Sequence, residues 1–232
     1  MARYQLLIEY VGTNFRGWQI QKTGLTVQGL IQKNLKKLLN EKIVVIGSGR
    51  TDSGVHAIEQ SAHFDCKKKI RNLESFVKSI NHFLNPKDVA IIKIKKRSNN
   101  FHSRFSAKQR IYKYVIFNQS SLPIIEKNRG WYLRKPLDLE LMKKGAKKLI
   151  GTNDFSTFRS SSCNARSPIK TIKSIKIKSS KNKIEFQFSS QSFLQHQVRS
   201  MVGCLKYLGE KKWDLKTFEK RFKSKKRILC AP

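Results

Sequence analysis

The chain has 232 residues, of which 49 are Lys or Arg and only 15 are Asp or Glu, so its formal net charge at pH 7 is +34. Such a charge attracts polyanions, above all nucleic acid, and makes their binding strongly salt-dependent. No run of 18 apolar residues is present, and residues 1–12 have the pattern of a strand and lack the layout of a signal peptide. We therefore expect a cytoplasmic protein with no membrane partner.

Strand and helix patterns alternate in the first half in the order β-α-β-β-α-β, which is the split plan of a ferredoxin-like fold. The first helix is marked by helical spacing of apolar residues behind an N-cap, Thr26. The strands are predicted at residues 3–11, 42–48, 57–65 and 88–96, and the helices at residues 26–39 and 72–84.

The second half repeats this order of elements from about residue 100. An apolar stretch that begins at Ile228 predicts one more strand, and the chain stops soon afterwards at Pro232, so we expect a final strand to be missing. Strands are predicted at residues 110–118, 169–179 and 183–191, and helices at residues 138–150 and 192–209.

Together these patterns predict an α+β protein made of two ferredoxin-like halves, residues 1–98 and 99–232. We expect antiparallel sheets in both halves, joined around a central basic cleft that receives the substrate.

The cysteines and histidines predict no metal site. The four cysteines are far apart in the sequence without a CxxC pair, which is typical of reduced thiols in a cytosolic protein. The five histidines are equally dispersed. A metal-dependent nuclease, which needs several carboxylates around hard cations, is disfavoured because the acidic residues are few and scattered and the DxD and HxH spacings are absent.

The sequence "GSGRTDSGVHA" (47–57) is a glycine-rich loop between two predicted strands, with Asp52 near its centre. A carboxylate in such a loop often caps a turn by accepting local N–H groups. In a cleft that faces phosphates, however, a lone carboxylate repels the ligand. Its presence in so basic a chain therefore favours a chemical role for Asp52.

Several motifs resemble those of the TruA family of tRNA pseudouridine synthases. The loop "GRTDSGVHA" is similar to the family signature, and the similarity extends over essentially the whole chain in the family's order. The other matching motifs are "YVGTNFRGWQIQ", "TVQG", "FHSRFSAKQRIYKYVI", "DFSTFRSSSCNARSPIKTI" and "FLQHQVRSMVG".

The resemblance implies that Asp52 is the catalytic residue, Tyr112 the active-site aromatic residue and Arg199 the partner of the aspartate. Tyr114 is the alternative to Tyr112, because both project from one face of a strand. Arg50 resembles a family arginine that helps displace the target base.

Three further residues of the matching motifs, Arg16, Arg159 and His196, are assigned to substrate binding. Phe15 and Trp18 flank Arg16, and such aromatic residues either stack on bases or anchor a core.

The resemblance further implies isomerisation of uridine to pseudouridine at tRNA positions 38, 39 and 40 in the anticodon stem-loop, by a homodimer. No cofactor is implied, because the reaction involves no redox change and no second reactant. A non-catalytic RNA-binding protein on the same fold would account for the charge, but it leaves the combination of Asp52, Tyr112 and Arg199 unexplained.

Overall fold

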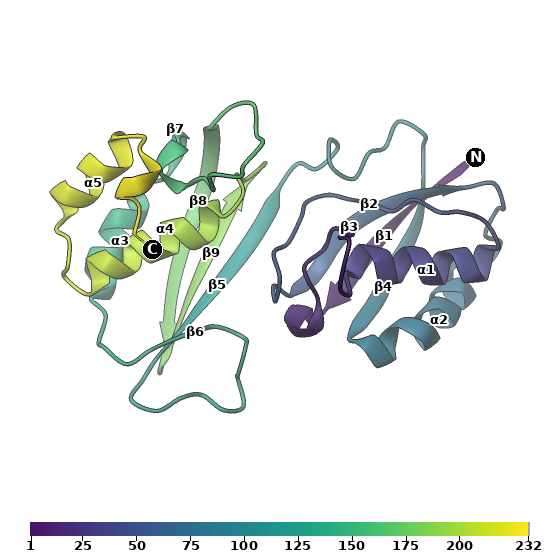
Figure 1. Ribbon diagram of the computed structural model, residues 1–232, viewed down its shortest axis with the longest axis horizontal. Coiled ribbons are helices and arrows are strands. Elements are labelled where there is room, and N and C mark those ends of the chain that lie inside the picture. Colours follow the sequence, from purple (N-terminus) through teal and green to yellow (C-terminus); the bar gives the residue numbers. More distant parts are fainter. Residues whose placement is uncertain (232) are drawn as a thin grey trace. The chain divides into compact units, whose positions relative to one another are not determined.

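The structure, a computed structural model, describes residues 1–231. It contains two compact units, of which the first is Met1–Ala107 and the second begins at Lys108 (Figure 1). Each unit combines one sheet with helices, so the predicted α+β class is confirmed.

The sheet of the first unit has four strands in the order β2-β3-β1-β4. The central strand β1 is antiparallel to β3 and to β4 along most of its length. This is the order expected when a β-α-β-β-α-β chain forms a split β-α-β unit. The strands are β1 (Ala2–Tyr10), β2 (Ile46–Gly47), β3 (Ala57–Cys66) and β4 (Val89–Arg97).

Two helices cover one face of this sheet, α1 (Val27–Leu39) and α2 (Leu73–Leu84) (Figure 1). The side chains of Thr26 and Asn72 accept hydrogen bonds from N–H groups of the first turns and so cap the two helices. Alternate residues of β1 are buried against the helices, because successive side chains of a strand point to opposite faces. A short 3-10 helix, η2 (Asn85–Lys87), links α2 to β4.

The strand predicted at residues 42–48 is reduced to two residues, so this prediction was largely wrong. Val45 is fully buried, yet its N–H donates to the side chain of Gln32 and its carbonyl accepts from that of Gln28. The backbone of Val45 is thus satisfied by polar side chains of α1 instead of a neighbouring strand.

The second unit has a five-stranded sheet in the order β6-β5-β9-β8-β7. Its long strands are antiparallel as predicted, whereas the three-residue β6 runs parallel to the end of β5. The strands are β5 (Arg110–Asn118), β6 (Trp131–Leu133), β7 (Gly151–Asp154), β8 (Ile169–Ser180) and β9 (Lys183–Ser190).

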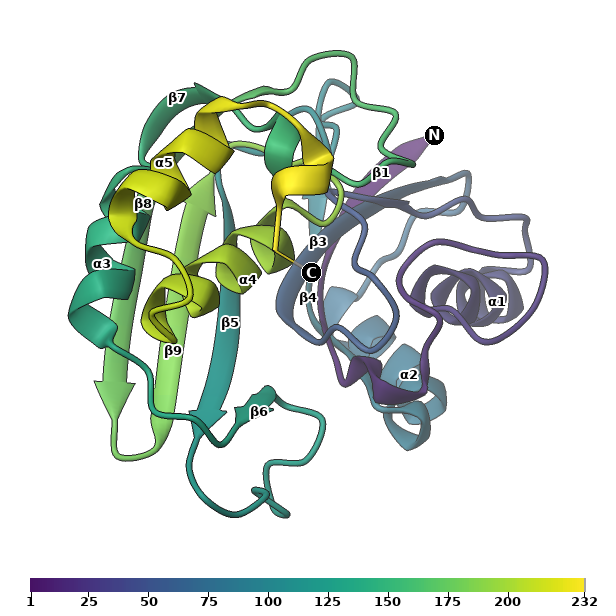
Figure 2. The same ribbon diagram turned by 60° about the vertical axis from the view of Figure 1, so that its left-hand side comes forward.

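Three helices pack on one face of this sheet, α3 (Leu139–Lys147), α4 (Gln197–Gly209) and α5 (Leu215–Lys223) (Figure 2). Asp138 caps α3, because its side chain accepts a hydrogen bond from the N–H of Leu141. Phe186 and Phe188 of β9 are fully buried beside Met201 and Leu205 of α4, which forms the centre of this core.

The last long helix begins at Gln197, five residues later than predicted. His196 has a φ of 62°, and a left-handed residue interrupts a right-handed helix. The carbonyl of Gln195 accepts from the N–H of Ser160 instead of joining a helical turn.

The strand predicted from Ile228 was also wrong, because Arg227–Leu229 form a 3-10 helix, η4. The side chain of Ile228 is 88% exposed. The turn is fixed by Arg221, which donates to the carbonyl of Leu229, and by Arg227, which donates to the hydroxyl of Ser200.

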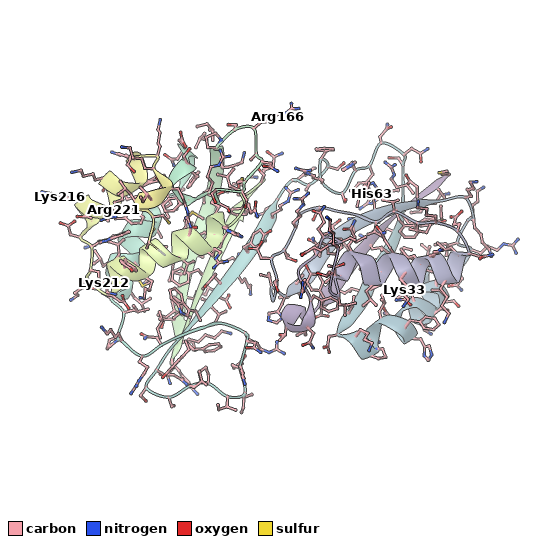
Figure 3. The ribbon with its side chains drawn as sticks, in the orientation of Figure 1. Lys33, His63, Arg166, Lys212, Lys216 and Arg221 are labelled. Atoms are coloured by element: carbon pink, nitrogen blue, oxygen red, sulfur yellow. The ribbon has the colours of Figure 1, made fainter. Side chains whose placement is uncertain are left out.

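Basic side chains extend from the surfaces of both units, among them Lys33 on α1 and Arg166, Lys212 and Lys216 in the second unit (Figure 3). None of the described helices has the length and apolar character needed to cross a bilayer.

Candidate active site

Asp52 lies on the loop 48–56, which connects β2 to β3 as predicted. The Asp52 side chain is exposed, and the backbone makes a turn in which the N–H of Val55 donates to the Asp52 carbonyl at 3.2 Å. Gly54, which lies between Asp52 and Val55 in this turn, has a φ of +77°, which favours glycine at this position. The carboxylate is therefore presented at the tip of a defined turn.

Residues 12–18, which precede α1, hold this loop in place. The N–H of Trp18 donates to the carbonyl of Thr51 at 3.1 Å, and the N–H of Gly54 donates to that of Phe15 at 3.3 Å. The Ser53 hydroxyl donates to the same Phe15 carbonyl at 3.1 Å. Two motifs that lie far apart in the sequence thus form one structure.

Close approach between these segments requires glycine at two positions. A Cβ atom on Gly12 would lie 2.0 Å from the Val55 carbonyl oxygen, and one on Gly17 would lie 2.6 Å from that of Thr51. Gly17 also has a φ of +83°, which disfavours other residues.

Two side chains anchor the ends of the loop to β1 and to the segment that follows it. The hydroxyl groups of Tyr10 and Thr51 share a hydrogen bond of 2.8 Å, and Nδ1 of His56 accepts from the N–H of Gly12 at 3.0 Å. Nδ1 of His56 therefore carries no proton in this arrangement. The sequence did not single out Tyr10 or His56, although both lie within the matching motifs.

Phe15 and Trp18 are core anchors, since each is about as buried as the sheet residues they contact, with 2% and 3% exposure. Arg16, between them, is exposed, and its guanidinium donates to the hydroxyl of Thr23 at 3.0 Å. Arg50 is exposed on the same loop as Asp52. The first unit therefore holds Asp52 and Arg50 on one loop.

In the second unit, Tyr112 and Tyr114 lie on one face of β5, opposite Phe188 and Phe186 of β9. The half-buried ring of Tyr112 contacts Phe193 edge to face, with centroids 5.1 Å apart. Burial raises the pKa of Tyr114, and the nearby Arg199 guanidinium partly opposes this shift. Arg199 is thus within electrostatic range of this face of β5.

Arg199 lies exposed in the first turn of α4, directly after the left-handed His196. The segment before α4 is joined to residues 159–163, because the N–H of Ser160 donates to the Gln195 carbonyl at 3.0 Å. Arg159 donates to the carbonyl of Cys163 at 2.6 Å within that segment. The second unit therefore brings the segments that carry Arg159, His196 and Arg199 together at the start of α4.

The predicted site residues thus form two groups. Asp52, Arg50 and Arg16 belong to the first unit, and the aromatic and basic residues of β5, the 159–163 segment and α4 belong to the second. Within residues 1–231, no group of three or more His, Cys, Asp or Glu side chains is placed to hold a metal ion. The chemistry available is that of a carboxylate, guanidinium groups and a phenol.

Comparison with known proteins connects both groups to one enzyme class. A family model described as tRNA pseudouridine synthase matches residues 6–106 and 146–231, which include Asp52 and Arg199 but not Tyr112. A tRNA pseudouridine synthase A from Pelagibacter ubique (strain HTCC1062) is 69% identical over 232 residues, which are all of this chain and 94% of that protein.

A second relative, a tRNA pseudouridine synthase A from Paramagnetospirillum magneticum (strain ATCC 700264 / AMB-1), is 40% identical over the whole chain and 90% of its own length. Because the family match and both full-length relatives agree, the chain belongs to the TruA family of tRNA pseudouridine synthases, which are isomerases that act on tRNA.

Proposed function

We propose that this protein isomerises uridine to pseudouridine at positions 38, 39 and 40 of the anticodon stem-loop of tRNA, with Asp52 as the catalytic residue. The observation that carries the proposal is the Asp52 loop itself. Its exposed carboxylate lies at a turn fixed by three hydrogen bonds to residues 15 and 18. A group that reacts with a base must be both accessible and held in place.

The reaction explains the need for a carboxylate. The bond between N1 of uracil and C1′ of the ribose breaks, the base turns while it stays bound, and C5 then joins C1′. The C5 proton leaves and N1 gains a proton, so atoms and electrons balance without a cofactor. An ionised aspartate can attack C1′, attack C6 of the ring, or promote a glycal intermediate.

The second unit supplies the other roles in this proposal. Tyr112 stacks on the uracil, and its hydroxyl or a water that it orients accepts the C5 proton. Arg199 pairs with Asp52, since a planar guanidinium can hold a carboxylate at two points. Tyr114 is the alternative to Tyr112, and its position within electrostatic range of Arg199 keeps that alternative open.

Substrate binding is assigned to the remaining basic groups. Arg50 helps to displace the target base from the helical stack, a step that costs a few kcal/mol. Arg16, Arg159 and His196 contact the RNA, where phosphate contacts fix its position without reading its sequence.

The test uses tRNA transcripts that keep uridine at only one of the three positions and have cytidine at the other two. After incubation with the protein and a chelator, pseudouridine is mapped by chemical modification and mass spectrometry. We expect one pseudouridine in each transcript, at the retained position. Tight binding without pseudouridine would instead indicate a non-catalytic RNA-binding protein, and pseudouridine elsewhere would refute the assigned positions.

The proposal includes a cytoplasmic homodimer that binds tRNA across both subunits, and its support is the family resemblance. Sedimentation with and without tRNA tests the oligomeric state. A monomer at micromolar concentration that remains fully active would contradict it.

A further inference from the structure

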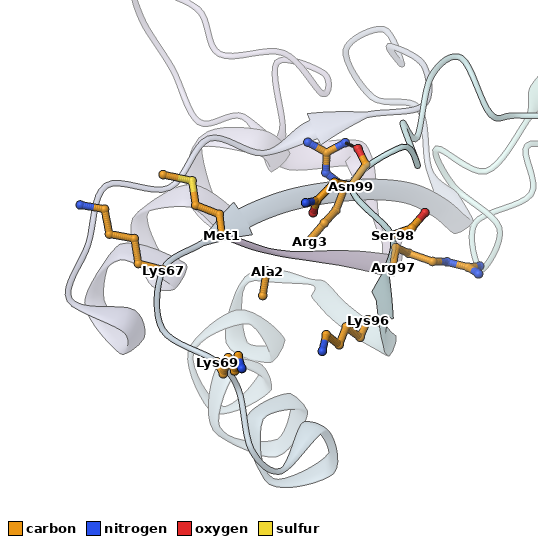
Figure 4. A pocket seen from close by; sticks show the side chains of 9 residues that line it. All are labelled: Met1, Ala2, Arg3, Lys67, Lys69, Lys96, Arg97, Ser98 and Asn99. Atoms are coloured by element: carbon orange, nitrogen blue, oxygen red, sulfur yellow. Dashed lines mark hydrogen bonds between the residues drawn. The ribbon is translucent and has the colours of Figure 1, made fainter.

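A basic cavity lies at the end of the first sheet where β1 begins. It has a volume of about 320 Å³, near the lower end of the range of ligand pockets. The ends of three strands meet there, because Ala2 of β1 is opposite Cys66 of β3 and Arg3 of β1 is opposite Arg97 of β4. The nine lining residues are Met1, Ala2, Arg3, Lys67, Lys69, Lys96, Arg97, Ser98 and Asn99 (Figure 4).

The basic side chains that line this cavity are of two kinds, arginines that are engaged in hydrogen bonds and exposed lysines. The guanidinium of Arg3 is fully engaged, since it forms two hydrogen bonds of 2.8 and 2.7 Å with Asp65 and donates to the carbonyls of Asn99 and Phe101. Arg97 donates to the side chain of Gln5 at 2.8 Å. These two arginines therefore shape the cavity wall.

The three lysines of the cavity are exposed, and none of their ammonium groups forms an ion pair within the described part of the chain. Figure 4 shows Lys69 and Lys96 on either side of Ala2, with Lys67 next to Met1. The Asp65 carboxylate is paired with Arg3, and the Glu41 carboxylate accepts from the backbone N–H of Lys67 at 2.9 Å. Neither residue lines the cavity, whose charged side chains are all cationic.

A neighbouring cavity of about 390 Å³ shares Met1 and Lys67 with this one, but it is also lined by Glu41 and Asp65 and by apolar residues such as Val44 and Ile46. Of these two cavities, the one at the start of β1 has a lining without carboxylates. Compact ammonium groups of this kind bind phosphate as point charges.

The cavity lies at the opposite end of β1 from the Asp52 loop. Tyr10, the last residue of β1, contacts Thr51 of that loop, whereas Ala2 and Arg3 line the cavity. Ala2 and Tyr10 are eight steps apart along the strand, which corresponds to about 25 Å at about 3.2 Å per residue. A phosphate bound in the cavity therefore belongs to a part of the ligand well removed from the reacting base.

We propose that this cavity binds a backbone phosphate of the tRNA substrate, as a second anchor about 25 Å from the catalytic loop. The inference rests on the proposed function, which supplies the polyanion. Contacts of this kind raise affinity and set the position of the RNA without contributing to bond cleavage. They affect KM and leave turnover at saturating tRNA unchanged.

The test replaces the three lysines together, as Lys67→Gln, Lys69→Gln and Lys96→Gln. The matched control is Lys33→Gln, Lys36→Gln and Lys78→Gln, which removes the same charge from exposed helix surfaces of the same unit that line neither cavity. Circular dichroism and thermal melts confirm that both variants fold. Binding of tRNA is measured by fluorescence anisotropy over a series of salt concentrations. The release of tritium from tRNA labelled at C5 of uridine is measured separately.

We expect the cavity variant to bind tRNA at least about tenfold more weakly than the control variant at physiological salt. The slope of log K against log salt should become shallower by about one for each phosphate contact that is lost. Turnover at saturating tRNA should match that of the unchanged protein. Because binding is scored independently of tritium release, a protein without isomerase activity would refute the proposed function and still report on the cavity.

Equal affinities of the two triple variants would overturn the proposal, since the lysines would then act only through the overall charge. A second arm measures ATP binding at millimolar concentration by isothermal titration calorimetry. Loss of ATP binding in the cavity variant with tRNA affinity equal to that of the control would assign the cavity to a small phosphorylated ligand and would also overturn the proposal.

Discussion

The two units each combine one sheet with helices, but their sheets are completed differently. In the first unit, β1 has antiparallel neighbours on both sides over most of its length. In the second, β5 is paired with β9 over most of its length, and Ile116–Asn118 also pair with β6. Among the described strands, β9 is thus the main neighbour of β5.

This difference affects the candidate site. The Asp52 loop leads into β3, which pairs with the central strand β1, and the loop is held by buried aromatic residues of the 12–18 segment. Tyr112 and Tyr114, by contrast, lie within β5, opposite Phe188 and Phe186 of β9. The carboxylate is therefore held on a loop by a separate segment, whereas the two tyrosines are held within a strand.

The largest effect is expected when the contact between the Asp52 loop and the 12–18 segment is broken. Gly17→Ala combines a positive φ with a Cβ placed 2.6 Å from the Thr51 carbonyl oxygen. Such strain and overpacking cost about 2–4 kcal/mol together. We expect a corresponding loss in the free energy of unfolding, measured by urea denaturation, and loss of activity.

The matched control is Gly54→Ala, where φ is +77° but no atom lies within 4 Å of the added methyl group. It should cost only about 1 kcal/mol. Equal destabilisation by the two substitutions would show that close approach does not decide how the loop is held.

The different pairing of β1 and β5 predicts a difference in hydrogen exchange. In the described residues, Ile111, Lys113 and Val115 pair with one strand, β9, whereas β1 lies between β3 and β4. We expect the amides of these three residues to exchange at least about tenfold faster than those of β1, since a strand with one neighbour opens more readily than a central strand. Peptide-level exchange measured by mass spectrometry checks this. Equal protection of both strands would mean that the edge of β5 is covered in solution.

A smaller effect is expected at the hydroxyl pair that joins β1 to the loop. Tyr10→Phe removes the hydrogen bond to Thr51 and should cost about 1 kcal/mol of stability. Because the loop is then less well positioned, we expect kcat to fall about tenfold with little change in tRNA affinity.

Tyr4→Phe provides the comparison at the other end of the same strand, where the Tyr4 hydroxyl accepts from the N–H of Ile70 at 3.0 Å. It should destabilise the protein to a similar extent and leave kcat unchanged. A fall in kcat in both variants would attribute the effect to general loss of stability.

The smallest effect concerns pH. His63 is 1% exposed on β3, its Nδ1 accepts from the N–H of Ser103, and burial, helped by Arg3 and His102, lowers its pKa below the ordinary value. The folded protein therefore binds this proton less readily than the unfolded chain. The free energy of unfolding should decrease as the pH falls below about 6.5, until the lowered pKa is reached.

Urea denaturation between pH 5 and pH 7.5 measures this dependence, with several pH values on each side of about 6.5. His63→Gln should make stability less dependent on pH in that interval. The exposed His82, changed to Gln, serves as the control and should leave the dependence unchanged. An unaltered dependence in His63→Gln would contradict the assignment.

Local sequence signals predicted much of the fold. Helices begin where Thr26, Asn72 and Asp138 cap the first turn, and the long strands follow their β-rich segments. The failures are tertiary in origin. Residues 42–45 have a strand pattern, but side chains of α1 satisfy the backbone of Val45. The start of α4 is delayed by a left-handed His196, which no local pattern signals.

The candidate site was likewise predictable where local sequence signals decide its structure, and not where contacts between distant segments do. The position of Asp52 on a loop between two strands was predictable, because glycine, serine and threonine interrupt regular structure. Its support by Tyr10, Phe15 and Trp18 was not, since it depends on contacts between segments far apart in the chain. The basic cavity at the start of β1 likewise exists only because three strand ends meet there.

The central claim, that Asp52 performs the chemistry, is tested most directly by tritium release from tRNA labelled at C5 of uridine. Asp52→Asn keeps the size of the side chain and removes its charge, and Glu74→Gln makes the same change at an exposed residue of α2. We predict that Asp52→Asn lowers release at least about a thousandfold while tRNA affinity is retained, and that Glu74→Gln has no effect. Tritium release by a folded Asp52→Asn protein at a rate close to that of the unchanged protein would contradict the account.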